Sequence, residues 1–414
     1  MTDLRIEPDW LADASLQSIL AILSADGEEA RIVGGPVRNA LLGLPVTDID
    51  IATTCLPEET IRRIEAARLK AVPTGVEHGT VTVVANGRPF EVTTLREDIE
   101  TDGRHAKVRF GKDWTADSKR RDFTINALYA TADGDVIDLV GGAADIETQT
   151  LRFIGEAEDR IREDYLRILR FFRFFAWYGR GRPDADGLRA STRLKEGLSR
   201  LSPERVWNEL RKLLSAKDPS RALLWMRQCG VLTAVLPESE RWGIDTIHPL
   251  TLAEAELGWQ PDPLLRLMAI VPPDAARLTE LARRLRLSNT ERDRLVAFAQ
   301  AEPVKAQESD GSLRARLYFG DCQAIKDRLR LALATQRGKP DTLSETARLG
   351  AQLSIAERFE APPLPVTGDD LIAAGIPKGP ELGQMLDRLR RAFVESGFTL
   401  SREKLLDLVK APAD

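Results

Sequence analysis

The 414-residue chain contains few cysteines and histidines and has no long apolar run. Its three cysteines, Cys55, Cys229 and Cys322, are widely separated, which excludes a disulfide framework and a cysteine zinc cluster. No apolar stretch approaches the roughly 18 residues that a membrane span requires. The first residues lack the basic region and apolar stretch of a signal peptide. These absences predict a cytoplasmic protein with no membrane partner.

The composition is that of a globular protein, with 43% apolar and 30% charged residues. A chain of this length is expected to form two to four domains. The net charge of −5 argues weakly against nucleic-acid binding. Residues 160–182 nevertheless contain seven arginines and two acids, interleaved with aromatic residues. One basic stripe of this kind can bind a polyanion, although a solvated helix face over an aromatic core is the alternative.

The pattern of apolar residues changes about one third of the way along the chain. Short apolar runs separated by turns predict strands at 30–33, 49–53, 81–84, 90–95 and 136–139. Helical patterns are interspersed at 13–27, 36–42, 57–70 and 124–129. Strands that alternate with helices indicate an α/β or α+β domain.

After residue 151 the strand signals disappear. The remaining pattern predicts helices at 156–177, 188–198, 203–214, 218–228, 263–270 and 275–287. A proline-rich stretch at 361–365 predicts a linker, and a compact helical segment follows at 367–410. The C-terminal two thirds of the chain are therefore expected to be all-α.

A glycine pair is followed by two aspartates that are separated by one residue. Gly34 and Gly35 let backbone N–H groups approach an anion, and a helix from Pro36 directs its positive end toward it. Asp48 and Asp50 would share one face of an extended strand. Two such carboxylates can hold two Mg²⁺ ions about 4 Å apart, as in two-metal phosphoryl transfer. The combination predicts transfer of a nucleoside monophosphate, although each piece alone is typical of a solvated strand or a simple turn.

A third acid lies on the predicted strand at 90–95. Glu91 could support the metal ligands or the attacking hydroxyl from there, and exposure to water is the alternative. We therefore predict Asp48, Asp50 and Glu91 as catalytic residues, with Asp48 and Asp50 as ligands of Mg²⁺.

The segment 120–127 contains a second set of polar residues. The guanidinium groups of Arg120 and Arg121 suit phosphate oxygens, and Asp122 can accept a hydrogen bond from a ribose hydroxyl. Asn126, one turn later, can brace that site. These residues predict a binding site for the phosphate and sugar of a nucleotide.

A third set lies on the helix predicted at 156–177. Asp164 and Arg167 are neighbours at a spacing of three, and the same spacing relates Arg167, Arg170 and Arg173. An Asp–Arg pair presents an acceptor and a donor together, which can address the edge of a nucleobase. A surface ion pair worth about 0.3 kcal/mol is the alternative.

Six segments together resemble, in order and spacing, the class II tRNA nucleotidyltransferases, the CCA-adding enzymes of the polymerase-β-like superfamily. The resemblance is strong over residues 30–215 and weaker toward the C-terminus, where TGDDLIAAGIPKGPELGQML is similar to the family's tail domain. The six segments are GGPVRNALLG…TDIDIAT, EHGTVTV, EVTTLR, RRDFTINA, EDYLRILRFFRF and SPERVWNELRKLL.

The resemblance implies an α+β nucleotidyltransferase head, with a mixed β-sheet and helices, followed by all-α neck, body and tail domains. We place the head at 1–150, the neck at 151–215, the body at 216–360 and the tail at 361–414. The helical part would bind the acceptor stem and elbow of tRNA by shape and phosphate contacts. No DNA partner is expected.

The resemblance also implies a role for each site residue, with two Mg²⁺ ions as cofactors and CTP and ATP as substrates. The chain departs from the family at Asn39, where many members carry aspartate, and a neutral side chain weakens an electrostatic role there. The implied nucleotide-binding residues are Gly34, Gly35 and Arg38 for the triphosphate, Arg121, Asp122 and Asn126 for phosphate and ribose, and Asp164, Arg167, Arg170 and Arg173 for the base.

Three alternatives compete with CCA addition. Bacterial poly(A) polymerase shares the head but typically carries an arginine-rich segment where this chain has VEHGTV at 76–81. CC-adding enzymes lack a flexible acidic–basic loop before RRDFT, and this chain has Asp102, Gly103 and Arg104 there. An inactive tRNA-binding protein would have lost the carboxylates, which are present. None of the three histidines precedes an aspartate, which excludes the His-Asp phosphohydrolase site of some relatives.

Overall fold

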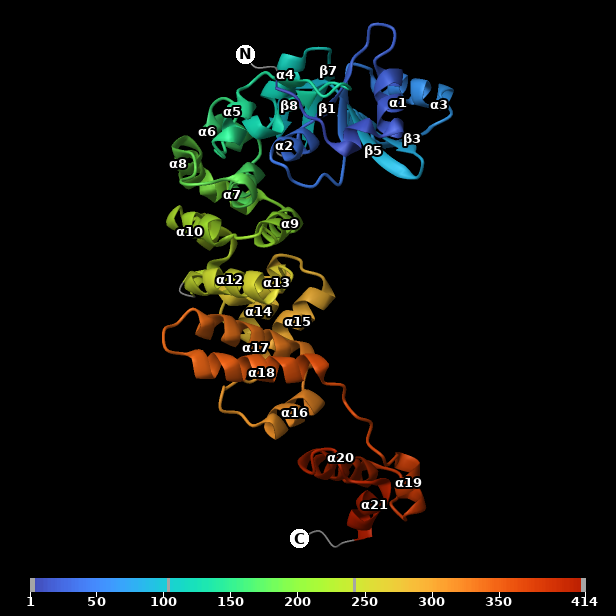
Figure 1. Ribbon diagram of the computed structural model, residues 1–414, viewed down its shortest axis with the longest axis vertical. Coiled ribbons are helices and arrows are strands. Elements are labelled where there is room, and N and C mark those ends of the chain that lie inside the picture. Colours follow the sequence, from blue (N-terminus) through green and yellow to red (C-terminus); the bar gives the residue numbers. More distant parts are fainter. Residues whose placement is uncertain (1–3, 103–104, 241–242, 411–414) are drawn as a thin grey trace. The chain divides into compact units, whose positions relative to one another are not determined.

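The computed structural model describes residues 4–102, 105–240 and 243–410, and all their side chains except those of 98–107 and 410. The chain forms two compact units, Met1–Pro237 and Glu238–Asp414 (Figure 1). Within the described ranges no helix is long and apolar enough to cross a membrane. The first unit continues past the predicted end of the neck, and the finer division into head, neck, body and tail stays a prediction.

The first unit begins with a mixed seven-stranded sheet of order β3-β4-β5-β2-β1-β8-β9 (Figure 1). Neighbouring strands are antiparallel except β2 and β5, which run parallel. Strands β6 and β7 form a separate antiparallel hairpin. The strands are β1 (Ala30–Val33), β2 (Asp50–Thr53), β3 (Lys70–Gly75), β4 (Thr80–Ala85), β5 (Arg88–Thr94), β6 (Arg96–Asp102), β7 (His105–Phe110), β8 (Leu128–Ala130) and β9 (Val136–Asp138).

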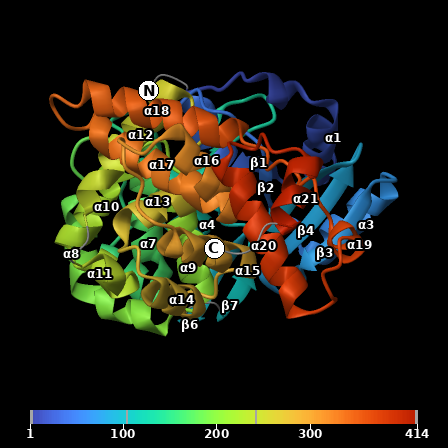
Figure 2. The ribbon, with the colours of Figure 1, turned by 90° about the horizontal axis from the view of Figure 1, so that it is seen from below.

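Helices α1 (Ala14–Leu23) and α3 (Pro57–Ala66) pack against this sheet. Figure 2 shows β3 and β4 side by side, with α3 next to them. The four buried residues of α1, Leu16, Ile19, Leu20 and Leu23, follow the helical period. In β4 the buried residues alternate with half-buried ones, as expected for a strand with one face in the core. These helices and the sheet therefore bury an apolar core between them.

The segment 124–129, predicted as a helix, is instead a short 3₁₀ turn at Thr124–Asn126 followed by strand β8. Every residue of 124–130 is buried, so periodicity could not distinguish a buried helix from a buried strand. Pairing with β1 and β9 decided the outcome. The helix predicted at 57–70 likewise ends at Ala66, because the following residues turn into β3.

The rest of the first unit is helical and is joined to the sheet by aromatic packing. The ring of Phe123 lies 4.9 Å from Phe153 and 5.3 Å from Phe174, measured between centroids. These helices are α2 (Gly35–Leu41), α4 (Trp114–Lys119), α5 (Gly142–Glu147), α6 (Ala157–Glu163), α7 (Leu166–Tyr178), α8 (Ala185–Leu194), α9 (Pro203–Leu214), α10 (Ser220–Gln228) and α11 (Val231–Val235).

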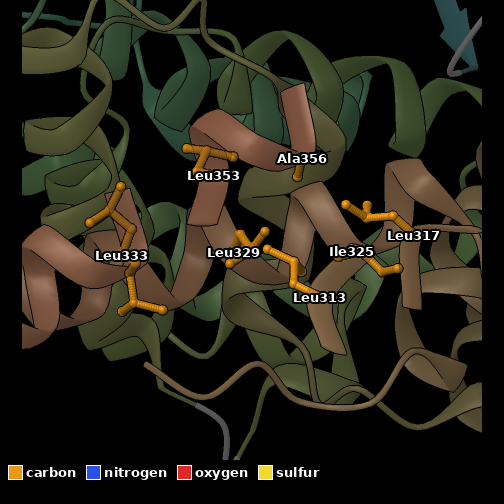
Figure 3. Close-up of a cluster of buried hydrophobic side chains, with 8 residues drawn as sticks. Leu313, Leu317, Ile325, Leu329, Leu333, Leu353 and Ala356 are labelled. Carbon is orange, nitrogen blue, oxygen red and sulfur yellow. The ribbon is translucent and has the colours of Figure 1, made fainter. Parts of the chain in front are cut away.

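The described part of the second unit contains helices and no strand. Leucines from three consecutive helices meet in one buried cluster, which Figure 3 shows with Leu313, Leu329 and Leu353 among its members. The helices are α12 (Ile247–Leu257), α13 (Pro263–Ile270), α14 (Ala275–Arg284), α15 (Asn289–Gln300), α16 (Asp310–Phe319), α17 (Cys322–Arg337), α18 (Leu343–Arg358), α19 (Gly368–Ala373), α20 (Pro380–Glu395) and α21 (Arg402–Lys410).

Candidate active site

A cleft of about 760 Å³ in the first unit brings the three predicted sets of residues together. Its walls include Asp48, Asp50 and Glu91 and all ten residues predicted for triphosphate, sugar and base. Eight basic and five acidic side chains line it, so the cleft suits an anionic ligand better than a neutral one. The roles of the individual residues stay predictions.

The two aspartates lie at the start of the central strand β2. Asp50 is its first residue, whereas Asp48 lies in the preceding loop. The expectation that both belong to one strand is therefore wrong for Asp48. The alternation still extends back through this loop, because Ile49 and Ile51 are buried while Asp48 is exposed. Both carboxylates reach the same cleft as a result.

Glu91 pairs directly with Asp50, because β2 and β5 run parallel with these residues in register. Adjacent strands lie about 4.8 Å apart, which brings the carboxylates close together. Burial, with Glu91 and Asp48 nearby, raises the pKa of Asp50 to about 6, and Arg121 opposes this rise. The acids thus form a site whose negative charge a bound cation would offset.

The carboxylates of Asp48 and Asp50 fit an Mg²⁺ ion that is bound together with a nucleotide. No group of three or more His, Cys, Asp and Glu side chains is placed to hold a metal ion within the described ranges. Magnesium is usually bound through one or two carboxylates, with waters and substrate phosphates completing its shell. Asp48 and Asp50 supply two carboxylates at a cleft rich in phosphate-binding side chains.

Asp50→Asn is expected to stabilise the metal-free protein at neutral pH. A carboxylate whose pKa rises on folding favours the folded state only while it is protonated. The free energy of unfolding of the wild type therefore falls by on the order of 1–3 kcal/mol as the pH rises from about 4 to about 6. Thermal unfolding in EDTA from pH 4 to 8 should show a higher Tm for the variant above pH 6 and no difference near pH 4. Parallel curves for the two proteins would contradict this prediction.

The glycine turn lies beside the acids. Gly34 has a φ of +73°, a backbone conformation that residues with a side chain rarely adopt. A Cβ added to Gly34 would lie 3.2 Å from the Asn126 carbonyl oxygen. Gly34 precedes α2, whose first turn contains Pro36 as predicted. The positive φ and the close approach to the Asn126 carbonyl favour glycine at position 34, and Gly34 and Gly35 both line the cleft.

Arg38 is nearly fully buried and is held by four hydrogen bonds to protein groups. It donates to the Asn126 Oδ1 at 2.5 Å, the Tyr178 hydroxyl at 2.8 Å and, twice, to the Asn39 Oδ1. Asn39 in turn donates to the Pro45 carbonyl at 2.8 Å. Arg38 therefore connects α2 to the end of α7, and Asn39 ties it to the loop that precedes Asp48.

Asp122 is buried, and both of its carboxylate oxygens accept hydrogen bonds. It accepts hydrogen bonds from the Asn126 Nδ2 at 3.1 Å and the Arg170 Nε at 2.7 Å. Burial opposes its ionisation, but Arg170 and Asn126 outweigh this effect and lower the pKa of Asp122. The expected contact between Asn126 and Asp122 is present, and Asp122 also holds Arg170, one of the arginines predicted to bind the base.

The helix predicted at 156–177 is broken at Asp164, which is extended, with φ −154° between α6 and α7. The expected pairing of Asp164 with Arg167 is therefore wrong. Asp164 accepts from Arg205 of α9 at 2.6 Å, whereas Arg167 donates to Glu163 at 2.5 Å. The Asp164 carboxylate also accepts from the Leu166 backbone N–H, which competes with a continuous helix. Both residues still line the cleft.

Helix α7 has an arginine face and an aromatic face. Arg167, Arg170 and Arg173 lie at a spacing of three and line the cleft. Four phenylalanines on the same helix are buried. Arg173 is held by Glu209 of α9 at 2.5 Å, and this contact orients the face further. The basic stripe and the aromatic core thus meet on one helix at Phe174, which lines the cleft and lies beneath the guanidinium groups of Arg170 and Arg173.

Sequence reasoning did not single out Arg96 and Lys212, which also line the cleft. Both lie in segments that carry the family resemblance, EVTTLR and SPERVWNELRKLL, but neither stands at a spacing that points to a ligand. Of the predicted loop, Asp102 ends β6 and pairs with His105 at the start of β7. Gly103 and Arg104 lie outside the described residues, as does the side chain of Asp102.

Three family models match the chain. They describe the poly(A) polymerase head domain at residues 30–152, the probable RNA- and SrmB-binding site of polymerase A at 184–242, and a putative second domain of tRNA nucleotidyltransferase at 263–409.

Full-length relatives are similar over nearly the whole chain. The mouse mitochondrial CCA tRNA nucleotidyltransferase 1 is 32% identical, with 95% of this chain and 89% of that protein covered. The CCA-adding enzyme of Leuconostoc citreum is 33% identical, with 96% of each covered. The crystal structure of the Bacillus stearothermophilus CCA-adding enzyme in complex with CTP superposes with a TM-score of 0.74 at 28% identity, covering 96% of each chain.

Proposed function

The chain belongs to the family of CCA-adding tRNA nucleotidyltransferases, and on this premise we propose that it adds CCA to the 3′ end of tRNA. CTP and ATP are the substrates, and pyrophosphate is released. The observation that carries the proposal is the single cleft that contains the acid pair, the glycine turn and the arginine face of α7.

The acids and the glycine turn serve the transfer step. Asp48 and Asp50 would hold Mg²⁺, which when bound lowers the pKa of the attacking 3′-hydroxyl and neutralises charge on the pyrophosphate. The amides of the Gly34–Gly35 turn and Arg121 would receive the triphosphate at the side of the cleft that the glycine turn lines. Glu91, in register with Asp50, would support the acid pair or the attacking hydroxyl.

Selection of the base would fall to Asp164 and Arg167, with Arg170 and Arg173 assisting. Asp164 presents acceptor oxygens, Arg167 presents donors, and each is held in place by another protein group. A buried donor or acceptor left unpaired by a wrong base costs about 1–3 kcal/mol. One mismatched hydrogen bond would therefore disfavour UTP or GTP about ten- to a hundredfold.

The test is incubation of the purified protein with tRNA that lacks its 3′ end. Each nucleotide is supplied alone, CTP and ATP are supplied together, and the products are resolved on a sequencing gel. Addition of CC with CTP alone and of CCA with both nucleotides is expected. Long A tails from ATP alone would identify a poly(A) polymerase, and a stop at CC with both nucleotides would identify a CC-adding enzyme. Binding of tRNA without extension would identify an inactive tRNA-binding protein.

The helical second unit would hold the acceptor stem and elbow of the tRNA, and this role stays a prediction. The cytoplasmic location also stays a prediction, since the mouse relative is mitochondrial by name.

A further inference from the structure

Asp117 lies behind the RRD segment, at a place that the proposed reaction does not use. It belongs to α4, and its side chain is only 1% exposed. It does not line the cleft, but both residues that it holds, Arg120 and Arg121, do. A buried carboxylate between two cleft arginines therefore requires an explanation.

The Asp117 carboxylate divides its two oxygens between the two guanidinium groups. Oδ1 accepts from the Arg120 Nε at 2.8 Å and forms an ion pair with the Arg120 Nη2 at 2.7 Å. Oδ2 accepts from the Arg121 Nη2 at 3.0 Å and Nε at 3.2 Å. Oδ2 also accepts from the Tyr129 hydroxyl at 2.8 Å. Each arginine is thus held along one edge of its planar fork.

The edge of the Arg121 guanidinium that Asp117 holds determines which edge remains available to a ligand. With Nε and Nη2 of Arg121 engaged, its Nη1 lies beside the glycine turn, 3.8 Å from where a Cβ on Gly34 would be. The Tyr129 ring supports the same guanidinium, with the Cζ 5.6 Å from the ring centroid. Trp114 packs edge-on against that ring. Arg121 is therefore fixed with its remaining edge near the predicted triphosphate position.

Arg120 and Arg121 also carry like charges. Adjacent guanidinium groups that are largely withdrawn from water repel each other, and each would gain by turning toward solvent. Burial opposes ionisation of Asp117, but Arg121 and Arg120 outweigh this effect and lower its pKa. One carboxylate therefore keeps two cations side by side. Arginines that are already ordered lose less conformational entropy when they bind an anion.

We propose that Asp117 is a positioning residue for the triphosphate, holding Arg120 and Arg121 together so that both act on the same phosphate chain. The inference rests on the proposed function, because the anion is the triphosphate of CTP or ATP. Asp117 itself touches no substrate. It acts through the arginines, and its effect belongs to nucleotide binding rather than to tRNA binding.

Asp117→Asn tests this proposal, because it keeps the shape of the side chain and removes the charge. The KM for CTP and for ATP is expected to rise at least about tenfold, the loss of one charge-assisted contact, while the KM for tRNA is unchanged and kcat falls less. Asp327→Asn is the matched control. It neutralises another buried carboxylate that accepts hydrogen bonds from an arginine, Arg294, and neither residue lines the cleft, so its nucleotide KM is expected to stay near wild type.

Calorimetric titration with inorganic tripolyphosphate gives a readout that needs no turnover. Its Kd is expected to rise in Asp117→Asn in parallel with the nucleotide KM and to stay unchanged in Asp327→Asn. An unchanged tripolyphosphate Kd in the folded Asp117→Asn variant, or an equal rise in the Asp327→Asn control, would overturn the proposal. A wild type that binds tripolyphosphate but does not extend tRNA would instead contradict the proposed function alone.

If Asp117→Asn does not fold, Asp117→Glu is the variant to use. The additional methylene group displaces both guanidinium groups while the charge is kept. Nucleotide KM and tripolyphosphate Kd are then expected to rise together at constant KM for tRNA. Wild-type values for both in the folded Glu variant would count against Asp117 as a positioning residue.

Discussion

Asp48→Asn and Asp50→Asn should each lower kcat for nucleotide addition by at least about a hundredfold, or about 2.7 kcal/mol of barrier. Both carboxylates reach the cleft, and Asp50 lies in register with Glu91 at the end of the parallel strand pair. An amide in place of either would weaken the hold on Mg²⁺ without changing the shape of the site. The measurement is single-turnover addition of CTP to tRNA that lacks its 3′ end.

Two controls separate this effect from misfolding. Asp133→Asn removes a similar charge from an exposed position of the same unit and outside the cleft, and it should leave kcat unchanged. The Kd for tRNA should stay within about twofold of wild type in all three variants, a difference of about 0.4 kcal/mol. A cleft variant that keeps more than about a tenth of wild-type kcat would show that the metal assignment is wrong.

Asp164→Ala and Arg167→Ala should reduce base selectivity more than the rate of chemistry. Both residues line the cleft, and each is oriented by a partner, Arg205 for Asp164 and Glu163 for Arg167. Removing either deletes a group that a wrong base would leave unpaired. Incorporation of UTP or GTP relative to CTP should therefore rise about ten- to a hundredfold.

The measurement is kcat/KM for each of the four nucleotides on the same tRNA. Arg162→Ala is the matched control, because this half-exposed arginine of α6 pairs with Glu158 and Asp159. It should leave the four ratios unchanged. Equal ratios in the Asp164 and Arg167 variants as well would exclude a template role for both residues.

Much of the candidate site was predictable because its signals are local. The glycine turn, the proline in the first turn of α2 and the alternation around Asp50 depend on backbone preferences within a few residues. The helix at Pro203–Leu214 was predicted to its ends for the same reason. The charged strands β6 and β7 were missed, because Arg96–Asp102 has no apolar alternation and pairs only within its own hairpin.

The partners of the charged side chains depend on contacts between distant parts of the chain. Helical spacing predicted that Asp164 would meet Arg167, but Arg205 lies 41 residues away in sequence and takes its place. Asp122 meets Arg170 across 48 residues, and Arg38 meets Tyr178 across 140. No periodicity carries this information, because the fold sets the distance between such residues.

The sequence by itself determined the fold class, the family and most of the charged residues that the cleft brings together. These follow from residue types at fixed spacings, which short-range backbone geometry converts into turns, strands and helices. Only the tertiary structure decided that α6 and α7 are separate helices, that Arg38 is engaged by protein groups, and that Asp117 holds two arginines from behind. A buried charge requires a partner, and packing between distant elements determines which partner is within reach.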